Sequence, residues 1–337
     1  MKFSILLTLM AFLSQASAEE PTPGGLQLDP SKLNDLIADK TAQPPASQDK
    51  PIDDTGTLKD QVLDVLNKGK VNEKNSAATQ GDPHFLMWNG RRYDFHGGCD
   101  LVFLDNPDYN HGQGLRIVIR TKIVHWWSYV QTAVVQIGND TLEVKGGVAH
   151  KEYYVNGKPG PHEEHSKAMP FTIAGHKVRF RVKSKTQFQF KIFLEDDQNI
   201  VIRSVKDFLK VDVQNHKKAT FGTSRGLLGS YEDGLMLARD GATILEDANE
   251  FGQEWQVRSD EPMLFHSVEG VQHPQACTIP NAEQKDQRRR LIEEAVLISY
   301  DEAAKACMTE AGTDLIECIN DVMITGDADM AGAYSDE

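Results

Sequence analysis

Cysteine is scarce in this sequence, with four in 337 residues, and no CxxC pair is present. That spacing argues against a zinc site. The signatures HExxH, GxGxxG and the phosphate-binding P-loop are also missing. These absences remove the common metalloprotease and nucleotide-binding classes, and the sequence predicts a protein that is not an enzyme.

Positive charge is also in short supply. Lysine and arginine number 36 against 50 acidic residues, which gives a net charge of −14. This balance argues against nucleic acid and against anionic membrane surfaces as partners. It suits divalent cations, which prefer carboxylate and carbonyl oxygens, although we favour solubility outside the cell as the explanation of the acidity.

Long apolar runs are absent beyond the N-terminus, so no membrane span is expected. Residues 1–18 have the order of a secretory signal peptide: Lys2, an apolar run over residues 3–13, and the small residues Ala16-Ser17-Ala18. We therefore expect a secreted, extracellular protein in a compartment that permits disulfides.

The cysteines are Cys99, Cys277, Cys307 and Cys318. An even number in an exported chain favours two bridges, for which three pairings are possible. We favour Cys99–Cys277 with Cys307–Cys318. The first bridge would tie the start of the main domain to the segment just past its end, which in the chain-entropy treatment stabilises the fold by roughly 5 kcal/mol.

Residues 19–78 have the composition of a disordered linker rich in Pro, Ser and Thr. Within it, Leu58, Val62, Leu63 and Leu66 fall at helical spacing. This spacing predicts a short helix over 55–68, which either docks on the following domain or is only nascent.

From residue 85 the apolar period changes to two. Apolar and polar side chains alternate over 115–120, 178–183, 188–194 and 209–214, as in half-buried strands. Asn156-Gly157 between two such runs is a two-residue hairpin turn signal. The pattern predicts a mainly β fold, an antiparallel β-sandwich or barrel-like domain over 79–258.

The pattern changes again after residue 258. Residues 259–280 are predicted to be an irregular connector, residues 281–327 a helical region and residues 328–337 a flexible tail. Ser299 and Glu302 have the spacing of a capping box. Cys307 and Cys318 would lie on two consecutive helices, where a bridge would staple a small hairpin.

Motifs at both ends of the β region point to a family. They are Gly81-Asp82-Pro83-His84-Phe85, Asn89-Gly90, Tyr93-Asp94-Phe95 and Gly98-Cys99 at the start, and Gly226-Leu227-Leu228-Gly229 and Phe251-Gly252-Gln253-Glu254-Trp255 at the end. Over residues 78–258 the chain resembles a von Willebrand factor type D domain. In that family the partner of the first cysteine lies just beyond the terminal tryptophan, where Cys277 falls here.

The chain departs from the family at two cysteines, which are replaced by Arg225 and Leu228. The cysteine-rich modules with which extracellular relatives build disulfide-linked polymers are absent as well. Covalent multimerisation is therefore not expected.

The resemblance implies a calcium site. Carried over by position, its ligands are Asn89, Ser230, Asp233 and Asp240, with Glu232 as an alternative to Asp233. Ser230 and Asn89 stand where the family has Asn and Asp, which lowers the ligand charge. The alternative is an acidic turn held by Asx hydrogen bonds alone.

The resemblance also raises self-cleavage at the Asp82–Pro83 bond, as in some mucin-type relatives, with His84 assisting proton transfer. The alternative is a structural turn, in which Pro83 fixes φ and Asp82 caps it. Asn139 lies in a glycosylation sequon at a predicted turn.

Two other clusters have a simpler explanation. His162 and His165 are three residues apart in a Pro- and Gly-flanked stretch, which favours a solvated loop over a metal site. Trp126 and Trp127 form either an exposed binding patch or hairpin packing, and we favour packing.

These observations favour a secreted, non-enzymatic interaction, adhesion or matrix protein that binds an extracellular protein or polysaccharide, with calcium stabilisation as a further hypothesis. A self-cleaving protein is one alternative. A fragment of a lipoprotein-type carrier is another, because type D domains also occur in large lipid carriers, although the long lipid-binding region of those carriers is missing.

Overall fold

The computed structural model describes residues 76–80, 83–124, 127–147, 152–160, 171–266, 277–280, 298–308 and 315–334. The predicted signal peptide, the helix over 55–68, residues 281–297 and the pair His162 and His165 lie outside the described residues.

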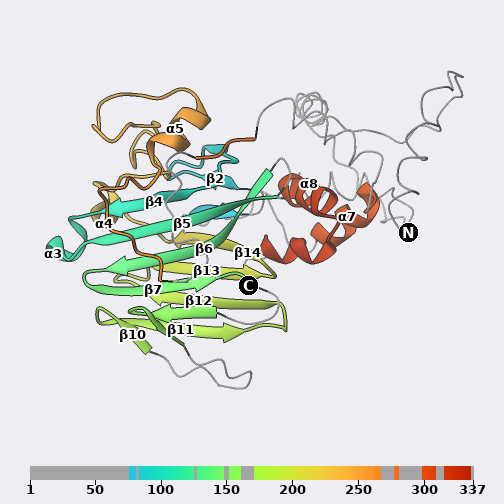
Figure 1. Cartoon of the computed structure of the whole chain (residues 1–337), viewed down its shortest axis with the longest axis horizontal. Helices are drawn as coiled ribbons and strands as arrows, with labels where there is room; N and C mark the ends of the chain where they lie inside the picture. The colour runs from blue at the N-terminus through green and yellow to red at the C-terminus, as the bar shows by residue number, and fades with distance from the viewer. Residues whose placement is uncertain are drawn as a thin grey trace, which may run out of the picture. The chain divides into compact units, whose positions relative to one another are not determined.

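The described strands form two antiparallel sheets (Figure 1). In spatial order, the eight-stranded sheet contains β10 (Phe171–Ile173), β11 (His176–Val182), β12 (Gln187–Phe193), β13 (Asn199–Val205), β14 (Phe208–Gln214), β1 (Ser76–Gln80), β2 (His84–Leu86) and β3 (Arg92–Asp94). The six-stranded sheet contains β4 (Asp100–Asn106), β5 (Leu115–Val124), β6 (Trp127–Ile137), β7 (Asp140–Lys145), β8 (Glu152–Val155) and β9 (Lys158–Pro159).

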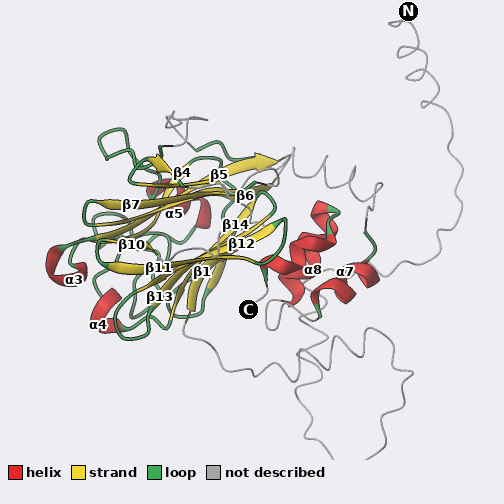
Figure 2. Ribbon diagram, turned by 90° about the horizontal axis from the view of Figure 1, so that it is seen from below, coloured by secondary structure: helices red, strands yellow, loops and turns green. Residues whose placement is uncertain are grey.

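The two sheets face each other across one apolar core, and Figure 2 shows them as two layers. Alternation decides which side chains enter this core. In β12, Phe188, Phe190 and Ile192 are buried, whereas the residues between them are partly exposed. The predicted β-sandwich is confirmed, as are the strands expected over 115–120, 178–183, 188–194 and 209–214.

Turn chemistry sets the strand register. Asn156 and Gly157 both have positive φ, 51° and 73°, as the predicted two-residue hairpin turn between β8 and β9 requires. The Asn156 side chain also accepts a hydrogen bond from the Thr141 amide at 2.7 Å, which ties this turn to β7.

Three short helices accompany the sandwich, one between β4 and β5 and two after β14. They are α3 (Tyr109–Gly112), α4 (Lys218–Phe221) and α5 (Ala248–Glu254). Asp247 caps α5 by accepting hydrogen bonds from the amides of Asn249 and Glu250. Among the described helices, none combines the length and apolar character that a membrane crossing needs.

A small helical module follows the sandwich, formed by α7 (Tyr300–Cys307), α8 (Leu315–Thr325) and the 3-10 helix η2 (Ala328–Ala333). Both views place α7 and α8 beside one end of the sheets (Figures 1 and 2). The module has its own apolar cluster, which includes Val205 of β13. The predicted capping box is confirmed, because Ser299 and Glu302 exchange hydrogen bonds.

The prediction of a flexible tail from residue 328 was wrong for the described part of it. Residues 328–333 form η2, and Met330 and Tyr334 are buried. The Tyr334 hydroxyl donates to the Asp321 carboxylate at 2.6 Å. Ala and Gly around one methionine give little helical signal, so the packing that orders this segment was not visible in the sequence.

The predicted start of the β-domain at residue 79 was late, since β1 begins at Ser76 and pairs with both β14 and β2. Ala77 and Thr79 are fully buried in this strand. A run of Ser, Ala and Thr has the composition of a linker. Here it forms a strand because it pairs with β14 on one side and β2 on the other.

Trp127 belongs to the interior, with 4% of its surface exposed. Its ring stacks on Phe208 at 5.9 Å and approaches Tyr129 at 6.0 Å. The packing interpretation is confirmed for Trp127, whereas Trp126 lies outside the described residues.

Candidate functional site

The two motif-bearing ends of the β region meet in space. The Tyr93 hydroxyl donates to the Leu227 carbonyl at 2.7 Å, and the Tyr93 ring meets that of Phe251 edge to face at 5.6 Å. Phe95 packs so closely on Gly252 that a side chain there would collide with the ring. The β2–β3 hairpin, the turn over residues 226–229 and helix α5 are therefore one packed unit.

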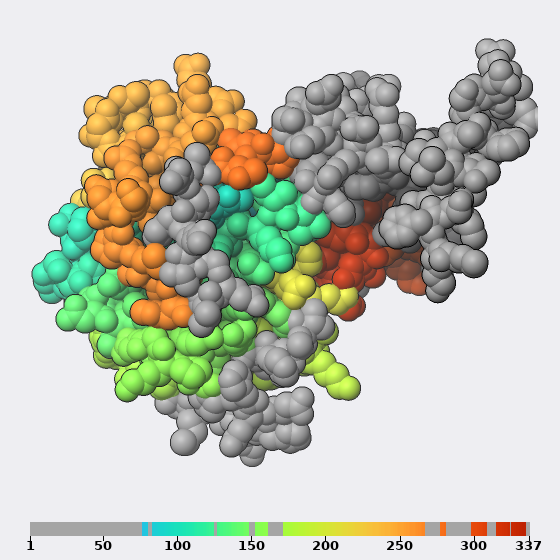
Figure 3. Space-filling view, viewed as in Figure 1, coloured from blue at the N-terminus to red at the C-terminus, as the bar shows by residue number. Residues whose placement is uncertain are grey.

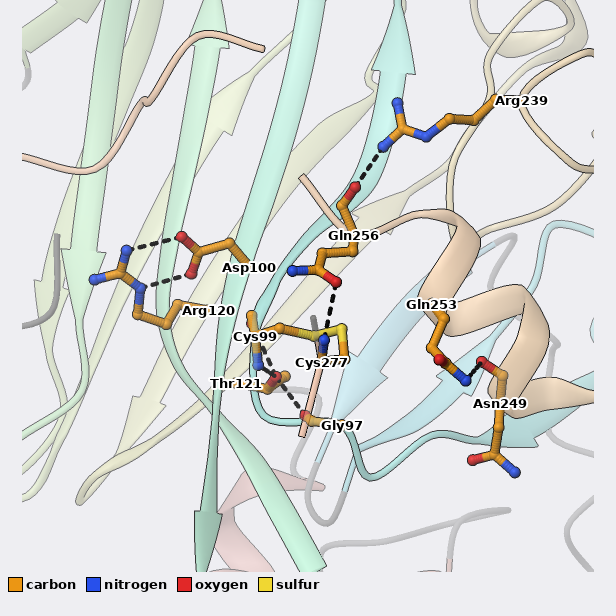
Figure 4. Close-up of a disulfide and its surroundings, with 10 residues drawn as sticks. All are labelled: Gly97, Cys99, Asp100, Arg120, Thr121, Arg239, Asn249, Gln253, Gln256 and Cys277. Carbon is orange, nitrogen blue, oxygen red and sulfur yellow. Dashed lines mark hydrogen bonds and ion pairs between the residues drawn. A yellow bond between two sulfur atoms is a disulfide. The ribbon is translucent and has the colours of Figure 1, made fainter. Parts of the chain in front are cut away.

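A disulfide closes this unit. Cys99 and Cys277 are bonded with a Cα–Cα distance of 5.0 Å, so the favoured pairing is confirmed. The Cys277 amide donates to Gln256, and the Thr121 hydroxyl donates to the Gly97 carbonyl (Figure 4). These contacts fix both segments that carry the bridge.

A buried ion pair lies beside the disulfide. The Arg120 guanidinium donates to both carboxylate oxygens of Asp100, at 2.6 and 2.8 Å (Figure 4). The Phe265 ring lies 4.4 Å from the guanidinium carbon. The two-pronged geometry holds β4 against β5 and satisfies both charges away from water.

The second bridge, Cys307–Cys318, joins α7 to α8 with a Cα–Cα distance of 5.9 Å and confirms the other favoured pair. Both cysteines are fully buried. The bridge staples a module whose apolar cluster is small.

His84 occupies the junction between the sandwich and this module. Its Nδ1 lies 2.7 Å from Asp94 of β3, and its Nε2 lies 3.4 Å from Asp321 of α8. The Asp321 side chain is 1% exposed, whereas that of Asp94 is 57% exposed. The imidazole therefore bridges a surface carboxylate and a buried one.

Burial lowers the pKa of the His84 imidazole, but its interactions with Asp321 and Asp94 outweigh burial and hold the pKa well above its ordinary value. The same partnership lowers the pKa of Asp94 against the opposing effect of burial. The arrangement favours an imidazolium held between two carboxylates at neutral pH.

Other charge pairs cross the same junction. Arg92 pairs with Glu317 of α8, and Lys206 pairs with Asp327 and Asp329 at the start of η2. The sheet thus presents cations and the module presents carboxylates, which orients the module on the sheet.

The predicted cation ligands are only partly assembled. The Asn89 amide donates to the Asp233 carbonyl at 3.3 Å, and the hydrogen bond from Ser230 lowers the pKa of Asp233. Glu232 instead pairs with Lys218. The Asp240 carboxylate accepts hydrogen bonds from its own turn, chiefly from Thr243, which lower its pKa to about 2.

The oxygen atoms of Asn89, Ser230 and Asp233 suit calcium in kind, although only one carboxylate is among them. Within the residues that the structure describes, no group of three His, Cys, Asp or Glu side chains is placed to hold a metal. Calcium binding stays a prediction.

The remaining predicted positions are placed as follows. Pro83 is buried, and its carbonyl accepts a hydrogen bond from the Phe95 amide, so it belongs to the turn that starts β2. Asp82 lies outside the described residues. Asn139 is exposed in the turn between β6 and β7, and its glycosylation stays a prediction.

Sequence reasoning missed Asp94 and Asp321 as partners of His84, and Tyr334 as the donor to Asp321. The first could have been found, because a hairpin about Asn89-Gly90 places His84 opposite Asp94. The other two lie far along the chain, and no pattern in the sequence links them to His84.

No protein-family model matches the sequence, and no curated protein matches it.

Proposed function

We propose that this chain is a secreted, non-enzymatic protein whose sandwich, of the type D kind, acts as an interaction module in the extracellular matrix or at a cell surface. The observation that carries the proposal is the union of the GDPH hairpin with the segment over residues 226–255, closed by Cys99–Cys277. A disulfide of this span is compatible with an oxidising, extracellular setting.

The architecture supports binding better than catalysis. The buried charges at the disulfide pair with each other, and the hydrogen bonds there fix backbone strands. A rigid sandwich with loops at its ends is a common scaffold for recognition.

A pull-down tests this proposal. Purified protein tethered to a surface is incubated with solubilised extracellular matrix, with and without calcium, and bound components are identified by mass spectrometry. Selective capture of matrix components is expected. Capture no greater than that of a heat-unfolded, reduced sample would contradict the proposal.

Calcium support forms part of the proposal and rests on the loop that joins Asn89 to Asp233. Millimolar calcium should raise the melting temperature relative to chelator, because a ligand of the folded state stabilises it by mass action. Asp233→Asn should abolish the rise, and a rise of equal size in that variant would reject the assigned ligands.

Self-cleavage is the second candidate, supported by His84, which follows Asp82-Pro83 in the sequence, and by the two carboxylate partners of its imidazole. Asp-Pro bonds are acid-labile because the Asp carboxyl can attack its own carbonyl carbon while the prolyl nitrogen, once protonated, leaves. Incubation at mildly acidic pH followed by intact-mass analysis tests it. A chain that stays whole removes this candidate.

The alternative of a lipid carrier is tested separately, by extraction of bound lipid from the purified protein.

A further inference from the structure

The outward side of strand β11 carries a row of cations. Lys177, Arg179 and Arg181 alternate with core-facing residues and are exposed. Alternate residues of a strand lie about 7 Å apart on one face, so the three charges form a straight line. Strands β10 to β12 lie at one end of the eight-stranded sheet, and their yellow-green atoms reach the surface in Figure 3.

The neighbouring strand β12 adds Lys191, which is directly opposite Arg179 in the register. Three of the cationic groups gather around the ring of Phe193, at 5.1 Å for Arg179, 5.5 Å for Lys191 and 6.0 Å for Lys177. The ring attracts these cations and limits their freedom. We call Lys177, Arg179, Arg181 and Lys191 the β11 basic face.

The three cations of β11 in this face have no acidic partner in the described part of the chain. Among the described residues, no carboxylate forms an ion pair or a hydrogen bond with Lys177, Arg179 or Arg181. The turn after β12 holds Glu195, Asp196 and Asp197, of which Asp196 pairs with Lys217. The cations of the face repel one another, and a bound anion would lower that local energy.

We propose that the β11 basic face binds a sulfated polysaccharide chain laid along the strand. Guanidinium groups match the oxygen pairs of sulfate in a two-pronged geometry, and the lysines add point charges beside them. A linear polymer with anionic groups on successive units can contact the whole row. This inference rests on the proposed extracellular function and names its ligand class.

The geometry favours a polysaccharide over single-stranded nucleic acid. Nucleic-acid grooves stack bases on open aromatic rings, whereas Phe193 is half-buried and has cationic side chains gathered around it. The face therefore offers charge without a stacking platform.

Retention on immobilised heparin at physiological salt tests the proposal with the full-length secreted protein. The variant Lys177→Gln/Arg179→Gln/Arg181→Gln should bind heparin at least about tenfold more weakly. The slope of log K against log salt should be shallower by about 2 to 3, because binding of the variant makes three fewer ionic contacts and so releases fewer counterions. The matched control Lys122→Gln/Lys158→Gln/Lys305→Gln changes net charge equally at exposed positions on other elements. It should bind like the wild type, and circular dichroism should show all three proteins folded.

Several results would overturn the proposal: no retention of the wild type, an equal loss in both triple variants, or equally tight binding of a DNA duplex or of polyglutamate. Neutral dextran should not bind. If the wild type captures matrix proteins but ignores heparin, the interaction function stands and the polysaccharide inference fails. If it captures neither, the interaction function fails as well.

Discussion

Replacing His84 with glutamine should destabilise the protein by about 3 kcal/mol near pH 6, because it removes the cationic member of a buried ion pair. The buried member is Asp321, whose side chain is 1% exposed. The contact with Asp94 adds little, since that carboxylate is 57% exposed and screened by water. A loss of this size lowers the melting temperature by about 6–12 °C in a domain of this size.

The effect should depend on pH. The pKa of His84 is raised in the folded state, so its stabilisation is complete below the ordinary imidazole pKa of about 6.5 and is lost as pH rises through the raised value. The free-energy difference between wild type and variant should therefore shrink from pH 6 to pH 9.

Urea unfolding followed by circular dichroism, with disulfides intact, measures this difference at pH 6, 7.5 and 9. His111→Asn is the control, because His111 is exposed and asparagine tolerates its positive φ of 60°. It should change stability little at any pH. A His84 variant that is equally destabilised at all three pH values would refute the ion-pair reasoning.

Two further predictions concern the helical module. Tyr334→Phe removes the hydroxyl that donates to Asp321 and should cost about 2 kcal/mol, as hydrogen bonds to charged groups do, measured by the same urea titration. Unchanged stability would show that another group satisfies Asp321. Cys307→Ala/Cys318→Ala opens the loop of α7 and α8, should cost roughly 3 kcal/mol and should raise hydrogen exchange in these helices, whereas unaltered exchange would contradict the stapling role.

The β-sandwich could be predicted because its strands carry large apolar residues at period two. Strands β5, β11, β12 and β14 were visible in this way. Strand β1 was not, since its sequence of Ser, Ala, Thr and Gln has no such alternation, and its burial comes from pairing between β14 and β2.

The candidate site likewise has one part that the sequence could predict and one part that depends on tertiary packing. The pairing of His84 with Asp94 follows from local hairpin register, which a turn signal can reveal. The approach of Asp321 depends on how the module docks on the sheet, and that docking is set by ion pairs and by a small apolar cluster. Such tertiary contacts leave no periodic signal.

Disulfide mapping of the protein, purified without reducing agents, tests the central structural account most directly. Proteolysis without reduction, with free thiols blocked, should yield one peptide pair that joins Cys99 to Cys277 and another that joins Cys307 to Cys318. Any other pairing, or thiols that react with the blocking reagent in the native protein, would contradict it.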